Sequence, residues 1–230
     1  MKCLILASGF GTRLYPITQS TPKGLLPYDN KPIINHIVEK IPEDIEIHVS
    51  TNEKFELQYR SWQETIDRDI SLLIEPITCE EQSFGAIGSM DYWANKEAIK
   101  DDIIVFASDN YFGFDMKEFI SSFDEENTLL AVHDIANKEA ACQFGTVKLS
   151  GNRIVELEEK AKKPKSSIIA TAGYIFPSRI ISILHEYCRR EKRDNLGEFI
   201  QYLANYDEVK AYLFSELWFD IGSVWHDLSK

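Results

Sequence analysis

Seven short apolar segments, rich in isoleucine, valine and leucine, alternate along this chain with segments of helical character. The apolar segments lie at residues 2–6, 45–50, 70–74, 103–107, 129–133, 168–176 and 209–214. The helical segments lie at residues 33–40, 53–66, 86–95, 116–123, 179–190 and 196–204. Strands that alternate with helices usually form parallel sheets covered on both faces. This order therefore predicts an α/β fold with a doubly wound, mostly parallel, Rossmann-like sheet.

One late segment departs from this alternation. Residues 145–149 and 153–157 flank the turn Ser150-Gly151-Asn152, which predicts a small β-hairpin inserted late in the chain. No linker, repeat or low-complexity stretch divides the 230 residues. We therefore expect a single domain over residues 1–230.

Composition excludes several classes of protein. The chain carries 25 Lys and Arg against 37 Asp and Glu, a net charge of −12 that would repel nucleic acid and anionic membranes. No apolar run reaches the roughly 18 residues of a membrane span, and the first apolar stretch is too short for a signal peptide. We expect a cytoplasmic protein. Its four cysteines form no C-x-x-C pair and are expected to be reduced.

The acidic residues are absent from the beginning of the chain. Residues 1–28 contain no Asp or Glu, and their only charges are Lys2, Arg13 and Lys23. Independent placement of the acids would give such a stretch only about 1% of the time. Chance and a buried first strand are one explanation. The other is that an acidic protein keeps this segment cationic in order to bind an anion.

The first apolar segment runs directly into a glycine-containing loop, Ser8-Gly9-Phe10-Gly11-Thr12-Arg13-Leu14. Its two glycines allow backbone N–H groups to approach a phosphate, and Arg13 offers a fork of donors to phosphate oxygens. Leu14 stands where a dinucleotide-binding G-x-G-x-x-G loop has its third glycine, and no G-K-[ST] follows. The loop therefore predicts phosphate binding at a strand end, but neither a dinucleotide site nor a P-loop.

The same stretch carries a longer pattern. It consists of residues 6–16, LASGFGTRLYP, followed by Thr18, Thr21-Pro22-Lys23, Leu26-Pro27 and Lys31-Pro32-Ile33-Ile34. The pattern resembles the signature of the sugar-phosphate nucleotidylyltransferases, above all the glucose-1-phosphate thymidylyltransferases and uridylyltransferases. Ser8 is a departure, because the family usually has Gly or Ala at that position.

Five later elements extend the resemblance to the whole chain. They are Ser108-Asp109-Asn110, Phe144-Gly145-Thr146-Val147, residues 158–164 (EEKAKKP), Ala172-Gly173-Tyr174-Ile175 and Trp218-Phe219-Asp220-Ile221-Gly222-Ser223. They resemble, in order, the G-D-N, sugar-facing, E-K-P, A-G-x-Y and W-x-D-x-G-[ST] elements of the family. Ala161 replaces the first proline of its element, and Tyr174 lies one position early.

The resemblance implies a reaction in which a sugar 1-phosphate attacks the α-phosphorus of an NTP and pyrophosphate leaves. A phosphate monoester is already largely deprotonated at neutral pH, so no general base is needed. Two polyanions must nevertheless be brought together, which calls for Mg²⁺ and cationic side chains. The resemblance implies Mg²⁺ ligands at Asp109 and Asp220, and catalytic roles for Arg13, Lys23, Asp109 and Lys160.

The resemblance also assigns binding residues. For the nucleotide, best UTP or dTTP, they are Leu6, Ala7, Ser8, Gly9, Gly11, Thr12, Arg13 and Lys23, with the looser candidates Gln82 and Gly85 near the base. For the hexose 1-phosphate they are Asn110, Gly145, Glu159, Lys160 and Gly173. A homo-oligomer is compatible with the sequence. Two alternatives stay open: a nucleotidylyltransferase for a non-sugar phosphate or phosphonate, such as phosphocholine, and a non-catalytic nucleotide-sugar sensor.

Overall fold

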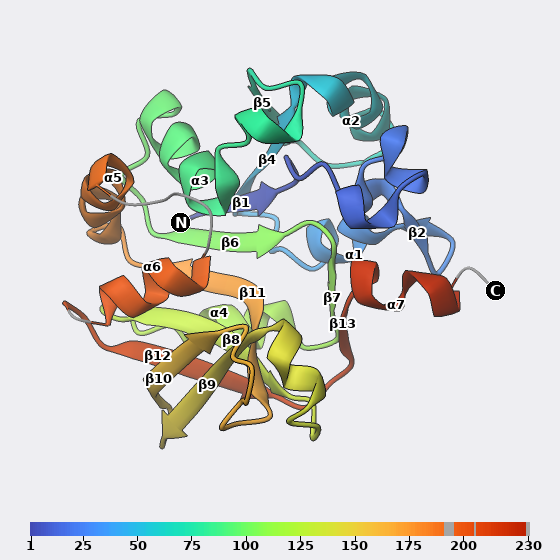
Figure 1. Cartoon of the computed structure of the whole chain (residues 1–230). Coiled ribbons are helices and arrows are strands. Elements are labelled where there is room, and N and C mark those ends of the chain that lie inside the picture. Colours follow the sequence, from blue (N-terminus) through green and yellow to red (C-terminus); the bar gives the residue numbers. More distant parts are fainter. Residues whose placement is uncertain (191–195, 205, 229–230) are drawn as a thin grey trace.

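A nine-stranded sheet runs through the computed structural model, which describes residues 1–190, 196–204 and 206–228 (Figure 1). In spatial order its strands are β5 (Ile70–Glu75), β4 (Glu46–Asn52), β1 (Lys2–Leu6), β6 (Ile103–Ala107), β11 (Ile168–Phe176), β8 (Thr128–Asp134), β12 (Val209–Phe214), β10 (Arg153–Glu159) and β9 (Gly145–Ser150). Each of the predicted apolar segments forms one of these strands, with shifts of at most two residues at the ends.

The prediction of a mostly parallel sheet is wrong, because the sheet is mixed. Strands β5, β4, β1 and β6 are parallel, as are β8 and β12. Strand β11 runs antiparallel to β6, β8 and β9, and β10 runs antiparallel to β9 and β12. Parallel neighbours need a long crossover connection. No α-helix lies between β9, β10 and β11, and β9 pairs with each of the other two strands in antiparallel fashion.

The predicted late hairpin is confirmed as β9 and β10, and it is part of the main sheet. Besides their mutual pairing, β10 contacts β12, and β9 contacts β11 through Thr146 opposite Ile169. Strands β11, β8, β12, β10 and β9 therefore close into a barrel-like ring, the lower part of Figure 1.

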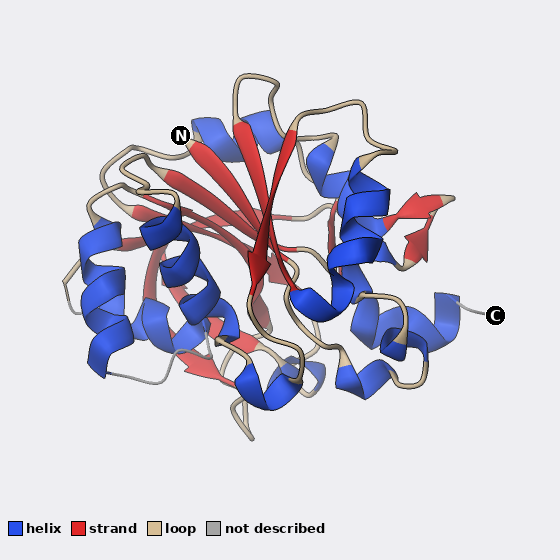
Figure 2. Cartoon of the chain, turned by 90° about the horizontal axis from the view of Figure 1, so that it is seen from above, coloured by secondary structure: helices blue, strands red, loops and turns tan. Residues whose placement is uncertain are grey.

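Helices lie on both faces of the sheet (Figure 2). The helices of the described residues are α1 (Ile33–Val38), α2 (Glu56–Gln63), α3 (Gly85–Lys96), α4 (Met116–Ser121), α5 (Ile180–Arg190), α6 (Leu196–Leu203) and α7 (Ile221–Leu228), of which α6 packs against β10 and α7 against the short strand β13 (Trp218–Asp220). Alternate residues of a strand point to opposite faces. Accordingly, Leu4 belongs to the core with α3, α5 and α6, whereas Cys3 and Ile5 belong to the core with α1, α2 and α4. No helix of the described residues is long and apolar enough to cross a bilayer.

The connection from β1 to α1 is ordered by short elements that the sequence did not predict. It contains the 3₁₀ turns Thr12–Leu14, Ile17–Gln19 and Lys23–Leu25, followed by the two-stranded hairpin β2 (Pro27–Tyr28) and β3 (Lys31–Pro32). Three further 3₁₀ turns lie at Glu53–Phe55, Glu80–Gln82 and Ala140–Gln143. A second small pair, β7 (Asn110–Phe112) and β13 (Trp218–Asp220), runs antiparallel and joins segments about a hundred residues apart.

Candidate active site

The candidate site lies where β1 and β6 end. These strands are parallel neighbours, with Leu6 opposite Ala107, and the Ser108 N–H donates to the Leu6 carbonyl at 2.9 Å. The loops that follow the two strands therefore leave the sheet at the same edge. A cavity of about 140 Å³ opens between them, and its lining consists of Leu6, Ala7, Gly9, Lys23, Gly24, Ser108 and Asp109.

The glycine loop is packed on one side, at Gly11, and open on the other side, at Gly9. Gly11 has a φ of +66°, a left-handed conformation that favours glycine, and a Cβ there would lie 3.0 Å from the Lys23 Cγ atom. The Thr18 hydroxyl donates to the Gly11 carbonyl at 2.7 Å. Above Gly9, a Cβ atom would meet nothing within 4 Å. A ligand can therefore lie directly on the backbone at Gly9.

Lys23 stands between the two predicted metal ligands. Its Nζ lies 2.9 Å from the Asp109 Oδ2. Although burial disfavours its charged form, Asp109 and Asp220 together raise the pKa of Lys23 above its usual range. The ammonium group therefore stays charged and balances two carboxylates at the edge of the sheet.

The short β7–β13 pair brings Asp220 to this point. Asp220 lies opposite Asn110 in the pair, and the Ile221 N–H donates to the Asp109 carbonyl at 2.9 Å. Burial, and then the charge of Asp109, raise the pKa of Asp220 to about 6, while Lys23 opposes the shift. With two carboxylates and only one close ammonium group, the site has room for a further positive charge. Mg²⁺ is often held by one or two carboxylates together with substrate phosphates. The donor set therefore fits Mg²⁺, although the described residues include no cluster of three or more metal-ligating side chains.

Gly222 completes this arrangement. Its N–H donates to the Asp220 Oδ1 at 2.6 Å. A Cβ on Gly222 would lie 2.9 Å from the Lys23 Nζ and 3.0 Å from that same carboxylate oxygen. The glycine of the W-x-D-x-G element is therefore explained by the close approach of Lys23 and Asp220.

A chain of hydrogen bonds orients the Asp109 carboxylate. The Trp218 Nε1–H donates to the Asn110 Oδ1 at 3.1 Å, and the Asn110 Nδ2 donates to the Asp109 Oδ1 at 3.0 Å. The rings of Phe144 and Trp218 pack edge to face, with centroids 5.5 Å apart. Trp218 was not among the predicted site residues, and only its place in the W-x-D-x-G element signalled it. Because both polar groups of the Asn110 side chain have partners here, its contact with a sugar stays a prediction.

Arg13 and the base-side candidates lie around the glycine loop. Arg13 is exposed and forms no ion pair within the described part of the chain, yet its charge acts on both Lys23 and Asp220. The Thr12 hydroxyl donates to the Glu80 carboxylate at 3.1 Å, which joins the loop to residues 76–84, a contact that the sequence did not indicate. Gln82 is exposed and accepts from the Thr78 N–H at 2.9 Å. Gly85 begins α3 with a φ of +69°. The base contacts of Gln82 and Gly85 stay predictions.

Three of the five predicted sugar residues, Gly145, Glu159 and Lys160, meet where β9 pairs with β10. Gly145 lies opposite Glu159, and its Cβ position is 2.7 Å from the Glu159 Oε2, so a larger residue would displace that carboxylate. Lys160 is exposed, and its Nζ lies 3.9 Å from the Glu159 Oε1. Its backbone has a φ of +47°. Strained backbone of this kind is concentrated at functional sites.

The A-G-x-Y-like element takes a different position from the other sugar-side residues. A Cβ on Gly173 would come within 2.8 Å of the Phe106 ring, so packing alone explains this glycine. Tyr174 is buried and stacks on Phe176 at 5.6 Å. Ala172 lies at a register shift of β11 with a φ of +57°. The contact of Gly173 with a sugar stays a prediction.

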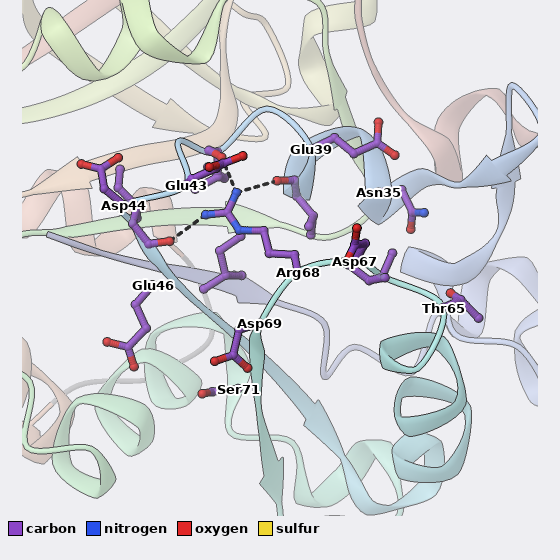
Figure 3. A pocket seen from close by; sticks show the side chains of 15 residues that line it. Asn35, Glu39, Glu43, Asp44, Glu46, Thr65, Asp67, Arg68, Asp69 and Ser71 are labelled. Carbon is purple, nitrogen blue, oxygen red and sulfur yellow. Dashed lines mark hydrogen bonds between the residues drawn. The ribbon is translucent and has the colours of Figure 1, made fainter.

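A second, wider hollow lies at the opposite end of the sheet (Figure 3). It measures about 790 Å³ and lies by the amino ends of β4 and β5. Its carboxylates are Glu39, Glu43, Asp44, Glu46, Asp67 and Asp69. The Arg68 guanidinium, the one arginine or lysine in this lining, donates to the backbone carbonyls of Pro42 and Ile45 at 2.6 and 2.8 Å. The hollow would repel a polyphosphate, so it is not the candidate site.

Comparison with known proteins assigns the chain to a family. The nucleotidyl transferase family model matches residues 2–229. The chain belongs to the nucleotidyl transferase family. The Bifunctional protein GlmU of Methanocaldococcus jannaschii is 29% identical to it over 227 residues, which cover 98% of this chain and 52% of that protein. The bifunctional sugar-1-phosphate nucleotidylyltransferase/acetyltransferase of Sulfurisphaera tokodaii is 27% identical to this chain over 233 residues, which cover 98% of this chain and 53% of that protein. The chain thus spans about half the length of these curated relatives.

Solved structures agree with this family fold. A Bacillus anthracis structure described as a glucose-1-phosphate thymidylyltransferase in complex with a sucrose superposes with a TM-score of 0.84, at 25% identity and with 96% of this chain and 90% of that chain covered. A UDP-glucose pyrophosphorylase complexed with UDP-glucose superposes with a TM-score of 0.79 at 21% identity, and the match covers 99% of this chain and 96% of that chain. The second likeness concerns the fold alone.

Alanine substitutions at Gly9 and Gly24, the two glycines beside the cavity, should affect different properties: nucleotide binding and thermal stability, respectively. Gly9→Ala should leave the melting temperature unchanged, because its Cβ enters open space, and should raise the KM for nucleotide about tenfold or more by blocking the backbone. Gly24→Ala should lower the melting temperature by several degrees, since its Cβ would lie 2.7 Å from the Tyr59 hydroxyl and 2.9 Å from the Ser108 Cβ. Thermal unfolding and steady-state kinetics check both. A large loss of stability in Gly9→Ala would contradict the open surface above the loop.

Trp218→Phe removes one N–H and keeps an aromatic ring. We expect about a tenfold lower turnover, because Asn110 and then Asp109 lose their fixed orientation, with little change in melting temperature. Trp62→Phe is the matched control: the Trp62 Nε1–H donates to the Asn35 Oδ1 at 2.8 Å within the buried core. It should lower stability and leave turnover unchanged. Equal turnover in the two variants would rule out the orienting role of Trp218.

Proposed function

We propose that this chain transfers a nucleotidyl group from an NTP, best UTP or dTTP, to a hexose 1-phosphate and releases pyrophosphate. The observation that carries the proposal is the Lys23, Asp109 and Asp220 cluster beside the open backbone at Gly9. In a protein of net charge −12, this is a site prepared for a cation and a polyphosphate together. The name of the Sulfurisphaera tokodaii relative supports a sugar 1-phosphate as acceptor, and that of the Bacillus anthracis structure supports a thymidine nucleotide.

Asp109 and Asp220 would hold the Mg²⁺ ion. When bound, this ion neutralises negative charge on the reacting phosphates. Lys23, at 2.9 Å from Asp109, is then placed to stabilise the charge that develops at the α-phosphate. Arg13, which is exposed beside the loop, would bind the β- and γ-phosphates and the leaving pyrophosphate. The backbone from Leu6 to Thr12 would bind the remaining nucleotide.

The acceptor would lie on the side of β9 and β10. Lys160 would bind the sugar-linked phosphate, and Glu159 would bind sugar hydroxyls. Gly145, which has no side chain, leaves room for the Glu159 carboxylate. An acceptor phosphate oxygen attacks the α-phosphorus, the bond from that phosphorus to the bridging oxygen breaks, and pyrophosphate leaves. Since the attacking oxygen is already deprotonated, these residues need to orient the two substrates and balance their charges.

Pyrophosphate release measures the proposed reaction directly. The purified chain is incubated with Mg²⁺, each common NTP, and a panel of hexose 1-phosphates, phosphocholine and an aminoalkyl phosphonate. We expect the highest kcat/KM for UTP or dTTP with a hexose 1-phosphate. Release with phosphocholine or the phosphonate alone would instead establish the non-sugar alternative. Nucleotide-sugar binding without release from any pair would establish a sensor.

Asp220→Asn separates activity from stability. Turnover should fall at least about a hundredfold, because a carboxylate that would hold the metal is lost. The pKa of Asp220 in the folded protein, about 6, lies above its ordinary 3.8, so the folded state binds this proton more tightly and gains stability from it as the pH falls from about 6 to about 4. The variant should therefore melt no lower than wild type at pH 7.5 without ligand, and should lose this pH-dependent gain.

Asp207→Asn is the control for this variant. Asp207 pairs with Arg179 at 2.7 Å outside the candidate site, so its loss should cost stability and not turnover. Near-normal turnover in Asp220→Asn, measured across a Mg²⁺ titration, would contradict the assignment of this ligand.

Lys160→Ala tests the acceptor side. We expect the KM for the sugar 1-phosphate to rise about tenfold and the KM for the nucleotide to stay within twofold, because only the acceptor phosphate loses a cation. Lys163→Ala removes another exposed lysine of the same loop and should change neither value. Steady-state kinetics with each substrate varied in turn give both constants. A rise confined to the nucleotide would place the acceptor elsewhere.

A further inference from the structure

A lysine in the turn that ends α1 is bound to backbone and not to a carboxylate. The Lys40 Nζ donates to the carbonyl oxygen of Phe112 and, at 3.3 Å, to that of Phe114. Lys40 forms no ion pair within the described part of the chain, although the charges of Asp115 and Glu216 act on it. Hydrogen bonds from a charged donor are stronger than those between neutral groups. Lys40 therefore ties the end of α1 to the end of β7.

The ammonium group is costly at this position. Burial lowers the pKa of Lys40, and the charges of Asp115 and Glu216 only partly oppose this. The charged form is thus disfavoured, and a methionine of similar length would fill the space without that cost. The two hydrogen bonds to backbone are what the ammonium group provides here and an apolar side chain would not.

The same end of α1 packs on the side chain at the middle of β7 (Figure 1). His36 and Lys40 are four residues apart, so they lie on one face of the helical turn. The His36 ring meets the Tyr111 ring edge-on, with centroids 5.3 Å apart, and the Lys40 Nζ lies 5.5 Å from the centre of the Tyr111 ring. Strand β7 is therefore held both through the Tyr111 side chain and through the Phe112 carbonyl.

The contacts of Lys40 lie where β7 leaves its partner strand. The Gly113 N–H donates to the Leu217 carbonyl at 2.7 Å, and a Cβ on Gly113 would lie 2.8 Å from that same oxygen. Phe112 and Phe114, whose carbonyls accept from Lys40, flank Gly113. Lys40 and Leu217 therefore bind the same three residues, 112–114, and we call this meeting point the junction.

The strand pair that ends at the junction carries the proposed metal ligands. Asn110, at the other end of β7, lies opposite Asp220, and its Nδ2 donates to the Asp109 Oδ1 at 3.0 Å. A pair of three-residue strands has little of its own to fix its register. If the pair splayed or shifted, Asp220 would move relative to Asp109. The junction is therefore a place where the fold can control the spacing of the two carboxylates.

We propose that Lys40 is a positioning residue for the metal site: by binding residues 112–114 it keeps β7 in register with β13, and so sets the spacing of Asp109 and Asp220. The inference rests on the proposed function, since it takes these two carboxylates to bind Mg²⁺. Lys40 is not in the lining of the cavity between β1 and β6. A site that already has its spacing loses less conformational freedom when the ion binds. Metal affinity therefore depends on Lys40, and the acceptor side does not.

Lys40→Met tests this through metal binding, because it keeps an apolar stem and loses every N–H donor. We expect the Kd for Mn²⁺, measured by calorimetry with a nucleotide analogue that cannot be cleaved at the α-phosphorus, to rise about tenfold. The Mg²⁺ concentration for half-maximal turnover should rise by the same factor, with the KM for the sugar 1-phosphate unchanged. Lys40→Arg, which offers charged donors to both carbonyls, should restore most of the Mn²⁺ affinity.

Lys2→Met is the matched control. Lys2 begins β1, at the end of that strand remote from the cavity, and its Nζ pairs with the Glu46 Oε2 at 2.8 Å. This variant should leave the Kd for Mn²⁺ unchanged. If Lys40→Met does not fold, Lys40→Gln, which is shorter and uncharged, carries the test with the same expected loss.

Gly113→Ala perturbs the junction without altering Lys40, because its Cβ would meet the Leu217 carbonyl. It should weaken Mn²⁺ binding as Lys40→Met does. The double variant Lys40→Met/Gly113→Ala should lose less affinity than the product of the two single effects, since both act on one junction.

The result that overturns the inference is distinct from failure of the proposed function. Wild type that binds Mn²⁺ with nucleotide but releases no pyrophosphate from any pair of substrates refutes the proposed function, and the comparison of Mn²⁺ affinities still decides the role of Lys40. An unchanged Kd for Mn²⁺ in folded Lys40→Met refutes that role. An equal loss in Lys2→Met, or a double variant whose effects multiply, refutes it as well. Wild type that binds no Mn²⁺ even with nucleotide refutes the metal site and the inference together.

Discussion

The arrangement of this molecule depends on one electrostatic cluster, in which the Lys23 ammonium group stands between the carboxylates of Asp109 and Asp220. Burial, and then the charge of Asp109, disfavour the ionised form of Asp220 and raise its pKa. The ammonium group offsets part of this shift. Such a cluster is tolerated because a bound cation and a polyphosphate together would complete its charge balance. Under the proposed function, stability in the free protein would be exchanged for affinity in the complex.

Packing around the cluster explains how residues so distant in sequence are held together. Asp220 and Asn110 face each other in a pair of three-residue strands, which would be too short to persist alone. Aromatic rings support the pair: Tyr111 stacks on Phe219 with centroids 5.3 Å apart, and Tyr28 packs edge-on against both. Tyr28 belongs to the hairpin that ends the proline-rich connection. That connection therefore carries Lys23 and also supports the strand that carries Asp220.

The sequence predicted the parts of this structure that depend on local pattern. Apolar runs located the strands, and the acid-free start with its glycines located the loop and Lys23. Long-range pairing left no such signal: the β9–β11 contact that closes the ring is a single register pair, and β7 and β13 have three residues each. The Thr12–Glu80 and Lys40–Phe112 contacts depend on how separate loops and strands meet, so no spacing in the sequence announces them.

A crystal structure with Mg²⁺ and a UTP analogue that cannot be cleaved at the α-phosphorus tests the central claim most directly. The account predicts that the triphosphate lies over Gly9 and Gly11, that the ion is bound by both Asp109 and Asp220, and that Lys23 contacts the α-phosphate. A nucleotide bound elsewhere, or an ion held without either carboxylate, would contradict it.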